Sequence, residues 1–249
     1  MKKLFLFICL ILSVTALVYA KSYKPGYIHR AYLEYVNERT VAVTAGYGEC
    51  NGKYWKIDNG TEIRVRLDKL DSQEGFLYIY IDESLSEFPA VKVYESSFEP
   101  YWDKEKNGWY SHDDRCIGAV WSPKGKAIVQ EFRYAGNDKY LIEGEPLEVI
   151  YSDSPDGEWQ TVESKRYIPL MSQSVFLWSI STDEQASGYH RFGLIAPMEY
   201  ARDVDLYEPL EFGEHEWVPV AESRNLIWQG DDDPRKTVEI AVMGWQLKR

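Results

Sequence analysis

The feature that most constrains this chain is an alternation of apolar and polar side chains with a period of two. Thr40–Thr44 and Ile63–Leu67 alternate in this way, and Phe76–Ile81 is a run of β-branched and aromatic residues. Successive side chains of a strand point to opposite faces of a sheet, so this period is typical of half-buried strands. Turn formers such as Asn51-Gly52 separate the runs. The sequence therefore predicts an all-β chain with few helical turns.

Strands of this spacing favour two β-sandwich or barrel-like antiparallel domains. The pattern is interrupted at Ala135-Gly136-Asn137-Asp138, where turn-forming residues follow one another. We therefore expect an N-terminal β domain over residues 21–134 and a C-terminal β domain over residues 135–249.

The first twenty residues have the pattern of a secretory signal peptide. Met1-Lys2-Lys3 is basic, the stretch from residue 4 to residue 18 is almost wholly apolar, and the sequence ends at Ala20 in a plausible cleavage site. The apolar stretch is shorter than the roughly 20 residues that a membrane-spanning helix needs. We expect residues 1–20 to be a signal peptide and the mature chain to be secreted or periplasmic, without a membrane span.

Two further global properties bear on partners and on the redox state. The chain carries a formal net charge of −12, which repels nucleic acid at long range and argues against it as a partner. After cleavage, Cys50 and Cys116 would remain. Since isolated cysteine pairs in oxidising compartments are commonly joined, we expect a disulfide between them.

Aromatic residues are the compositional excess of this chain, which has 9 Trp, 19 Tyr and 9 Phe. Four of them gather in one segment and form the predicted binding loop: Tyr101, Trp102, Trp109 and Tyr110. Exposed aromatic side chains stack on sugar faces or anchor protein interfaces. The partner expected from this loop is a protein or a glycan at the cell envelope. The alternative is that these side chains close the open end of a β-sandwich.

No motif in the sequence predicts catalysis, a metal or a cofactor. The chain lacks His-Glu-x-x-His, Gly-x-Ser-x-Gly and a Gly-rich phosphate loop. Ser111-His112-Asp113-Asp114 places an imidazole beside carboxylates, but neighbouring residues converge poorly on one ligand, so a polar turn is favoured. We expect a non-enzymatic binding or structural protein. Two alternatives stay open: a carbohydrate-active hydrolase on a β scaffold, and a subunit of an exported assembly. An oligomeric state stays open as well.

The N-terminal half resembles a β-rich module of tailed-bacteriophage tail-fibre and virion proteins. The resemblance rests on the order of Thr40–Gly46, the aromatic strand Phe76–Asp82, Arg115–Gly118 and a final Phe132, and is strongest over residues 27–133. It implies a β fold and a binding or assembly role. Cys116 stands where that family has a second arginine. A signal peptide does not suit a virion protein assembled in the cytoplasm, so the resemblance carries no virion role for this chain.

Overall fold

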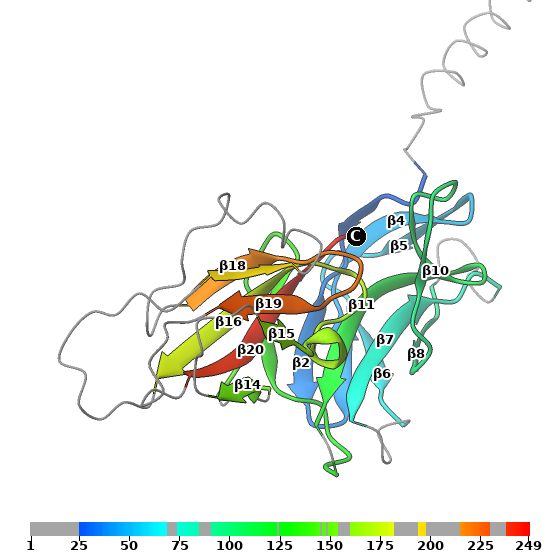
Figure 1. Ribbon diagram of the computed structural model, residues 1–249. Helices are drawn as coiled ribbons and strands as arrows, with labels where there is room; N and C mark the ends of the chain where they lie inside the picture. The colour runs from blue at the N-terminus through cyan, green and yellow to red at the C-terminus, as the bar shows by residue number, and fades with distance from the viewer. Residues whose placement is uncertain are drawn as a thin grey trace, which may run out of the picture.

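The protein is seen in a computed structural model, which describes residues 25–68, 74–84, 91–123, 125–144, 146–147, 149–153, 160–181, 194–197, 215–229 and 238–249. The predicted signal peptide, residues 1–20, lies outside the described residues. Figure 1 shows a chain built of strands, and its strand pairs are antiparallel within the described part. The prediction of an all-β antiparallel fold is confirmed. The described sheets are open, as in a β-sandwich, and none of them closes into a barrel.

The N-terminal third forms two small sheets of three strands each. The first has the order β1-β4-β5, and the second has the order β2-β3-β6. Their strands are β1 (Ile28–Arg30), β4 (Gly46–Cys50), β5 (Lys53–Ile57), β2 (Leu33–Asn37), β3 (Thr40–Val43) and β6 (Ile63–Arg66). Asn51 and Gly52 connect β4 to β5 with positive φ angles of 48° and 79°, as a tight hairpin turn requires.

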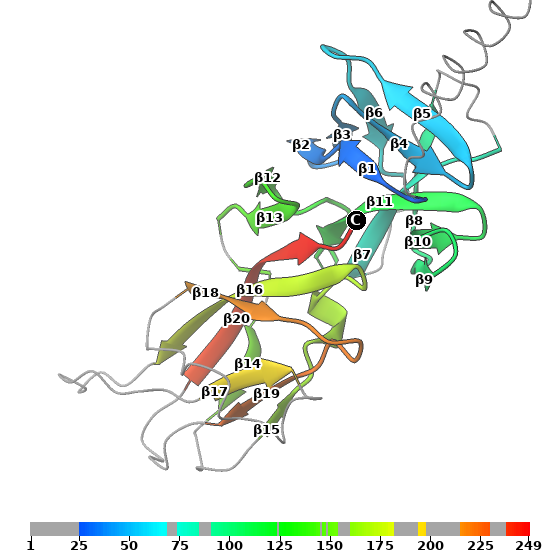
Figure 2. The same cartoon turned by 90° about the horizontal axis from the view of Figure 1, so that it is seen from above.

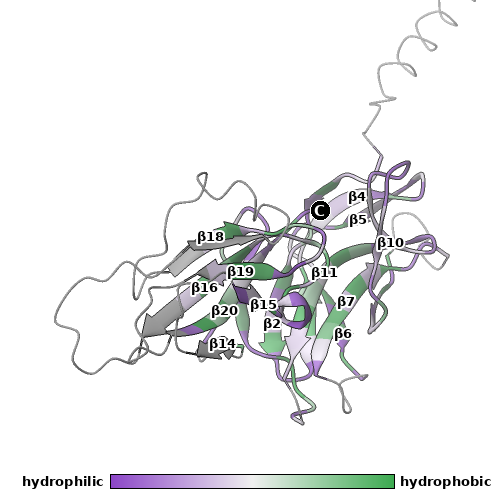
Figure 3. Cartoon of the chain, viewed as in Figure 1, coloured by the Kyte–Doolittle hydropathy of each residue, from purple (hydrophilic) through white to green (hydrophobic). Residues whose placement is uncertain are grey.

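A five-stranded sheet follows, in the order β8-β7-β11-β10-β9. Its strands are β7 (Gly75–Ile81), β8 (Val93–Ser96), β9 (Tyr101–Asp103), β10 (Gly108–Ser111) and β11 (Asp114–Ser122). The central strands β7 and β11 are buried along most of their length, and Figure 3 colours them mainly hydrophobic. β9 lies at one edge of this sheet, and no strand of the described residues pairs with its outer side.

The C-terminal half forms a six-stranded and a three-stranded sheet. In the first, β12-β13-β20-β16-β18 lie in order and β14 also pairs with β20; in the second the order is β15-β19-β17. The strands are β12 (Phe132–Tyr134), β13 (Lys139–Ile142), β14 (Val149–Asp153), β15 (Gln160–Val162), β16 (Ser172–Ser181), β17 (Leu194–Pro197), β18 (His215–Pro219), β19 (Leu226–Gln229) and β20 (Val238–Leu247). A single turn of 3-10 helix, η1 (Lys165–Tyr167), follows β15.

The two halves meet over one continuous hydrophobic core. Trp55 and Trp121 from the N-terminal half and Trp228 and Trp245 from the C-terminal half are all buried in it. Each large side chain buried in this way contributes on the order of 1.5–3 kcal/mol. Figure 2 shows the C-terminal strand β20 running between the two groups of sheets.

Two hydrogen bonds, one buried and one partly buried, also join the halves. The Leu33 amide donates to the Tyr140 hydroxyl at 3.2 Å, and the Leu170 amide donates to the Tyr78 hydroxyl at 3.3 Å. β12 precedes the expected boundary at residue 134 but pairs with β13, which follows it. The division into two domains stays a prediction, and the described contacts couple the two parts closely.

Close packing explains one glycine in the centre of a buried strand. Gly118 lies beside a bulge in β11, where the register with β7 shifts between Cys116 and Gly118. A Cβ atom at this position would lie 2.6 Å from Cδ1 of Leu33. The missing side chain therefore lets β2 approach β11.

We predict that Tyr140→Phe lowers the free energy of unfolding by about 1–3 kcal/mol, because it leaves the buried Leu33 amide without an acceptor. The matched control is Tyr101→Phe, whose half-exposed hydroxyl donates to the His112 carbonyl at 3.2 Å. Urea unfolding of both variants measures the difference. Equal losses would show that the Tyr140 hydroxyl does not connect the two halves.

Candidate functional site

Three of the four residues predicted to form a binding loop lie together beside a cleft. The predicted loop is in fact the β9–β10 hairpin, in which Trp102 pairs with Trp109 and Tyr101 pairs with Tyr110. The indole rings of Trp102 and Trp109 meet edge to face, with centroids 5.4 Å apart. Edge-to-face aromatic pairs stabilise one another by about 0.5–1.5 kcal/mol.

The cleft, which we call the aromatic cleft, has a volume of about 720 Å³. The hairpin forms one wall, and the start of β16, the segment after β18 and the end of the chain form the rest. Its lining residues are Pro100, Tyr101, Trp102, Trp109, Leu170, Ser172, Gln173, Val220, Ala221, Glu222 and Lys248. A cleft of this size suits a small molecule or part of a chain-like ligand.

Backbone hydrogen bonds tie the walls of the aromatic cleft to one another. The Val220 amide donates to the Gln173 carbonyl at 3.0 Å, and the Lys248 amide donates to the Met171 carbonyl at 2.8 Å. The Lys248 ammonium nitrogen also lies 4.2 Å from the centroid of the Trp102 ring, a favourable cation–π distance. Segments that are far apart in the sequence thus hold the cleft in one shape.

Two side chains of the aromatic cleft carry buried polar atoms without a hydrogen-bond partner among the described residues. These atoms are Nε1 of Trp109 and Oγ of Ser172. A buried polar atom without a partner costs about 1–3 kcal/mol.

Tyr110 is the predicted contact residue that the structure excludes from this surface. It is fully buried, because it follows Trp109 on β10 and successive strand residues face opposite sides of the sheet. Its ring lies 5.1 Å from the Arg115 guanidinium and 5.0 Å from the Lys106 ammonium. Burial raises the pKa of the Tyr110 hydroxyl to about 12. Tyr110 packs in the core on the buried side of the β9–β10 hairpin and does not present a contact surface.

The Arg115 side chain anchors the hairpin that carries the aromatic residues. It is fully buried, and its guanidinium donates to the Trp109 carbonyl at 3.1 Å and to the Gly26 carbonyl at 2.9 Å. A Cβ atom on Gly108 would lie 2.1 Å from Nη1 of Arg115, so only glycine leaves room for the guanidinium. Burial lowers the pKa of Arg115.

The predicted disulfide is not formed in the structure. Cys50 and Cys116 are both free and buried. The Cys50 thiol donates to the Asp113 carbonyl at 3.3 Å, whereas the Cys116 sulfur lies 3.2 Å from the Met171 sulfur. The two thiols therefore point toward different partners. Burial raises the pKa of each thiol to about 12.

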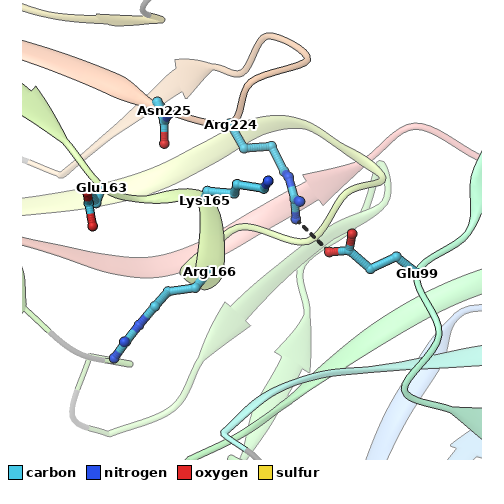
Figure 4. Close-up of a pocket in the computed structure, with 6 residues that line it drawn as sticks. All are labelled: Glu99, Glu163, Lys165, Arg166, Arg224 and Asn225. Carbon is cyan, nitrogen blue, oxygen red and sulfur yellow. Dashed lines mark hydrogen bonds and ion pairs between the residues drawn. The ribbon is translucent and has the colours of Figure 1, made fainter.

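A second cavity, which we call the cationic cavity, has a volume of about 440 Å³ (Figure 4). Its lining residues are Glu99, Glu163, Lys165, Arg166, Arg224 and Asn225. The Arg224 guanidinium, which is almost fully buried, donates to Oε1 of Glu99 at 3.1 Å and to the Ile168 carbonyl at 3.0 Å. Sequence reasoning missed this site, because its members come from three distant segments and share no motif.

The polar segment Ser111–Asp114 is a structured turn, as the sequence analysis favoured. His112 has a φ of 57° between β10 and β11. The Lys106 ammonium bonds to Asp113 at 2.7 Å and lowers the pKa of that carboxyl. Within the described residues, no group of three or more His, Cys, Asp or Glu side chains is placed to hold a metal ion. The same part of the chain contains no helix that is long and apolar enough to cross a membrane.

Comparison with known proteins adds no relative. No family model matches the chain, and no curated protein matches it in sequence. The resemblance of residues 27–133 to phage tail modules stays a prediction.

We predict that both thiols react when the protein is denatured without reductant and that neither reacts in the folded protein at pH 8. The reason is that each thiol is free, buried and protonated. Maleimide labelling followed by mass spectrometry of the peptides with Cys50 and Cys116 measures this. Two unlabelled cysteines in the denatured, non-reduced protein would show instead that Cys50 and Cys116 are joined in a disulfide.

The raised thiol pKa values also predict alkaline instability. A thiol with a pKa of about 12 in the folded state, against about 8.5 when unfolded, contributes stability that is present below pH 8.5 and is lost as pH rises toward 12. At pH 10 the loss is about 2 kcal/mol per thiol. Urea unfolding at pH 8 and pH 10 should therefore show a smaller decrease for the Cys50→Ala/Cys116→Ala variant than for the wild type. Equal decreases in both proteins would refute the assignment.

Proposed function

We propose that this protein binds a carbohydrate in the aromatic cleft. The observation that carries the proposal is the meeting of the paired Trp102 and Trp109 rings with polar side chains in one concave site. A sugar ring has apolar C–H faces that stack on aromatic rings and hydroxyl groups that need hydrogen-bond partners around them. The aromatic cleft offers both kinds of contact.

The exposed aromatic surface is held in a fixed orientation before any ligand arrives. The Tyr101 side chain is 50 % exposed, yet its hydroxyl is bonded to the His112 carbonyl. The Lys248 ammonium fixes the Trp102 ring in the same way. Prior ordering of contact groups lowers the entropy cost of binding. The polar side chains of Gln173, Glu222 and Lys248 line the same cleft and supply hydrogen bonds for ligand hydroxyl groups.

Binding is favoured over hydrolysis by the acidic residues of the cleft. Glycosidases commonly place two carboxyl groups on either side of the scissile bond. Among the described residues that line the aromatic cleft, Glu222 supplies the single carboxylate. Binding of a small ligand is favoured over a flat protein interface, because the site is concave.

We place this activity outside the cytoplasm, in the periplasm or in the secreted fraction. The support is the basic and apolar pattern of residues 1–20. Under this proposal the partner is a glycan of the envelope or of the surroundings, and the protein acts without a cofactor.

We predict that Trp102→Ala weakens carbohydrate binding at least about tenfold, which corresponds to about 1.4 kcal/mol, because it removes the ring on one wall of the cleft. The matched control is Phe98→Ala, since Phe98 is 76 % exposed in the same segment but does not line the cleft. A glycan array followed by calorimetry with the best soluble oligosaccharide measures both variants.

The outcomes of this experiment separate the alternatives. Loss of binding in Trp102→Ala alone, with unfolding energies within about 2 kcal/mol of the wild type, supports the proposal. Equal effects of the two variants, or an array without a ligand, would overturn it. Release of new reducing ends from a bound glycan would replace it with the hydrolase alternative.

A further inference from the structure

The two cavities border one another along the chain. Glu99 lines the cationic cavity, and the next residue, Pro100, lines the aromatic cleft. On the opposite side, Glu222 lines the aromatic cleft and Arg224 lines the cationic cavity. The same two connections, between β8 and β9 and between β18 and β19, thus form walls of both sites.

We propose that the cationic cavity binds the carboxylate or sulfate group of a saccharide whose ring lies in the aromatic cleft. The ligand class is then an acidic saccharide. This inference rests on the proposed function, because it assigns a second contact to the same ligand.

The charges around the cationic cavity carry this inference. The chain as a whole has a net charge of −12, yet Lys165, Arg166 and Arg224 gather at one cavity. Figure 4 shows that the side chains of Lys165 and Arg224 extend toward each other, whereas those of Arg166 and Glu163 point away. Arg166 pairs instead with Glu74 at 3.1 Å. Two cations therefore face the position that an anion would take.

The Arg224 side chain is built for recognition of an anion. Its side chain is only 6 % exposed, and its Nε atom has no hydrogen-bond partner among the described residues. A guanidinium presents its donors in a planar fork that matches the oxygens of a carboxylate or sulfate group. Burial strengthens such bonds because little solvent screens them.

The carboxylate of Glu99 is already bonded to the Arg224 guanidinium. Its carboxylate accepts a hydrogen bond from Arg224 Nη1, while 52 % of its side chain is exposed to solvent. An incoming acid group would take the place of the Glu99 carboxylate and gain Lys165 as a second cation. Glu99 thus competes with the ligand, and its removal should strengthen binding.

The test compares acidic oligosaccharides with neutral forms of the same chains. The probes are oligosaccharides of polygalacturonate, alginate, hyaluronan and chondroitin sulfate, each set beside its methyl-esterified or desulfated form. We expect at least one acidic probe to bind about tenfold more tightly than its neutral form. That difference should shrink as salt is raised, since salt screens charge pairs near the surface.

Three variants locate the contact. Lys165→Gln should weaken binding of the acidic probe about three- to tenfold without affecting its neutral form. Glu99→Gln should strengthen binding of the acidic probe. Arg133→Gln, the matched control at an exposed arginine that lines neither cavity, should change the affinity less than twofold. Lys165 and Glu99 are exposed enough for both variants to fold, whereas Arg224 also bonds to the Ile168 carbonyl and is therefore left unchanged.

The results distinguish failure of this inference from failure of the proposed function. Equal binding of acidic and neutral forms, with no effect of Lys165→Gln or Glu99→Gln, would overturn the acidic contact and leave carbohydrate binding intact. In another outcome, Lys165→Gln weakens binding of the acidic probes whereas Trp102→Ala does not. This result would show an anion site separate from the aromatic cleft and would overturn the joint site. Absence of binding by every probe would overturn both.

Discussion

The buried guanidinium of Arg115 is the interaction on which the candidate site depends. A buried charge is costly unless its hydrogen bonds are made. Arg115 makes two of them, to the Gly26 and Trp109 carbonyls, and the face of Tyr110 lies against it, whereas its Nε atom has no partner among the described residues. These contacts join the start of the described chain to the edge hairpin. Gly108 leaves the space that the guanidinium needs. Arg115 thus holds the backbone of the β9–β10 hairpin, and this backbone determines where Trp102 and Trp109 lie.

The site itself is assembled from distant parts of the chain. The β9–β10 hairpin supplies the aromatic wall, the start of β16 and the segment after β18 supply polar groups, and Lys248 next to the last residue covers Trp102. A second bond near the chain end supports this arrangement, because the Arg249 guanidinium donates to the Ala31 carbonyl at 2.8 Å. Both ends of the described chain are thus fixed close to the hairpin that forms the cleft.

Sequence alone predicts the strands well and the site only in part. The alternating runs at Thr40 and Ile63 become β3 and β6, and the β-branched and aromatic run at Phe76 becomes β7, because these local patterns are typical of strands. Four aromatic residues were predicted to form a contact loop, and the structure buries one of them, Tyr110. The alternation between Trp109 and Tyr110 could have separated the contact residue from the core residue.

The remaining errors arise from contacts between distant segments. Both cysteines were expected to pair, yet one sulfur lies beside Asp113 and the other beside Met171. The spacing of cysteines along a chain does not determine where each thiol points. The cationic cavity was missed for the same reason. Glu99, Lys165 and Arg224 come together only where the two halves of the folded chain pack against each other. No local pattern encodes such a site.

The most direct test of the carbohydrate cleft is an NMR titration of the tryptophan indole N–H groups. The ligand is the soluble oligosaccharide that binds best. The proposal predicts that the indole signals of Trp102 and Trp109 shift with saturation, while those of the buried Trp55, Trp121 and Trp245 stay in place. Saturable binding that leaves the signals of Trp102 and Trp109 unmoved would contradict it.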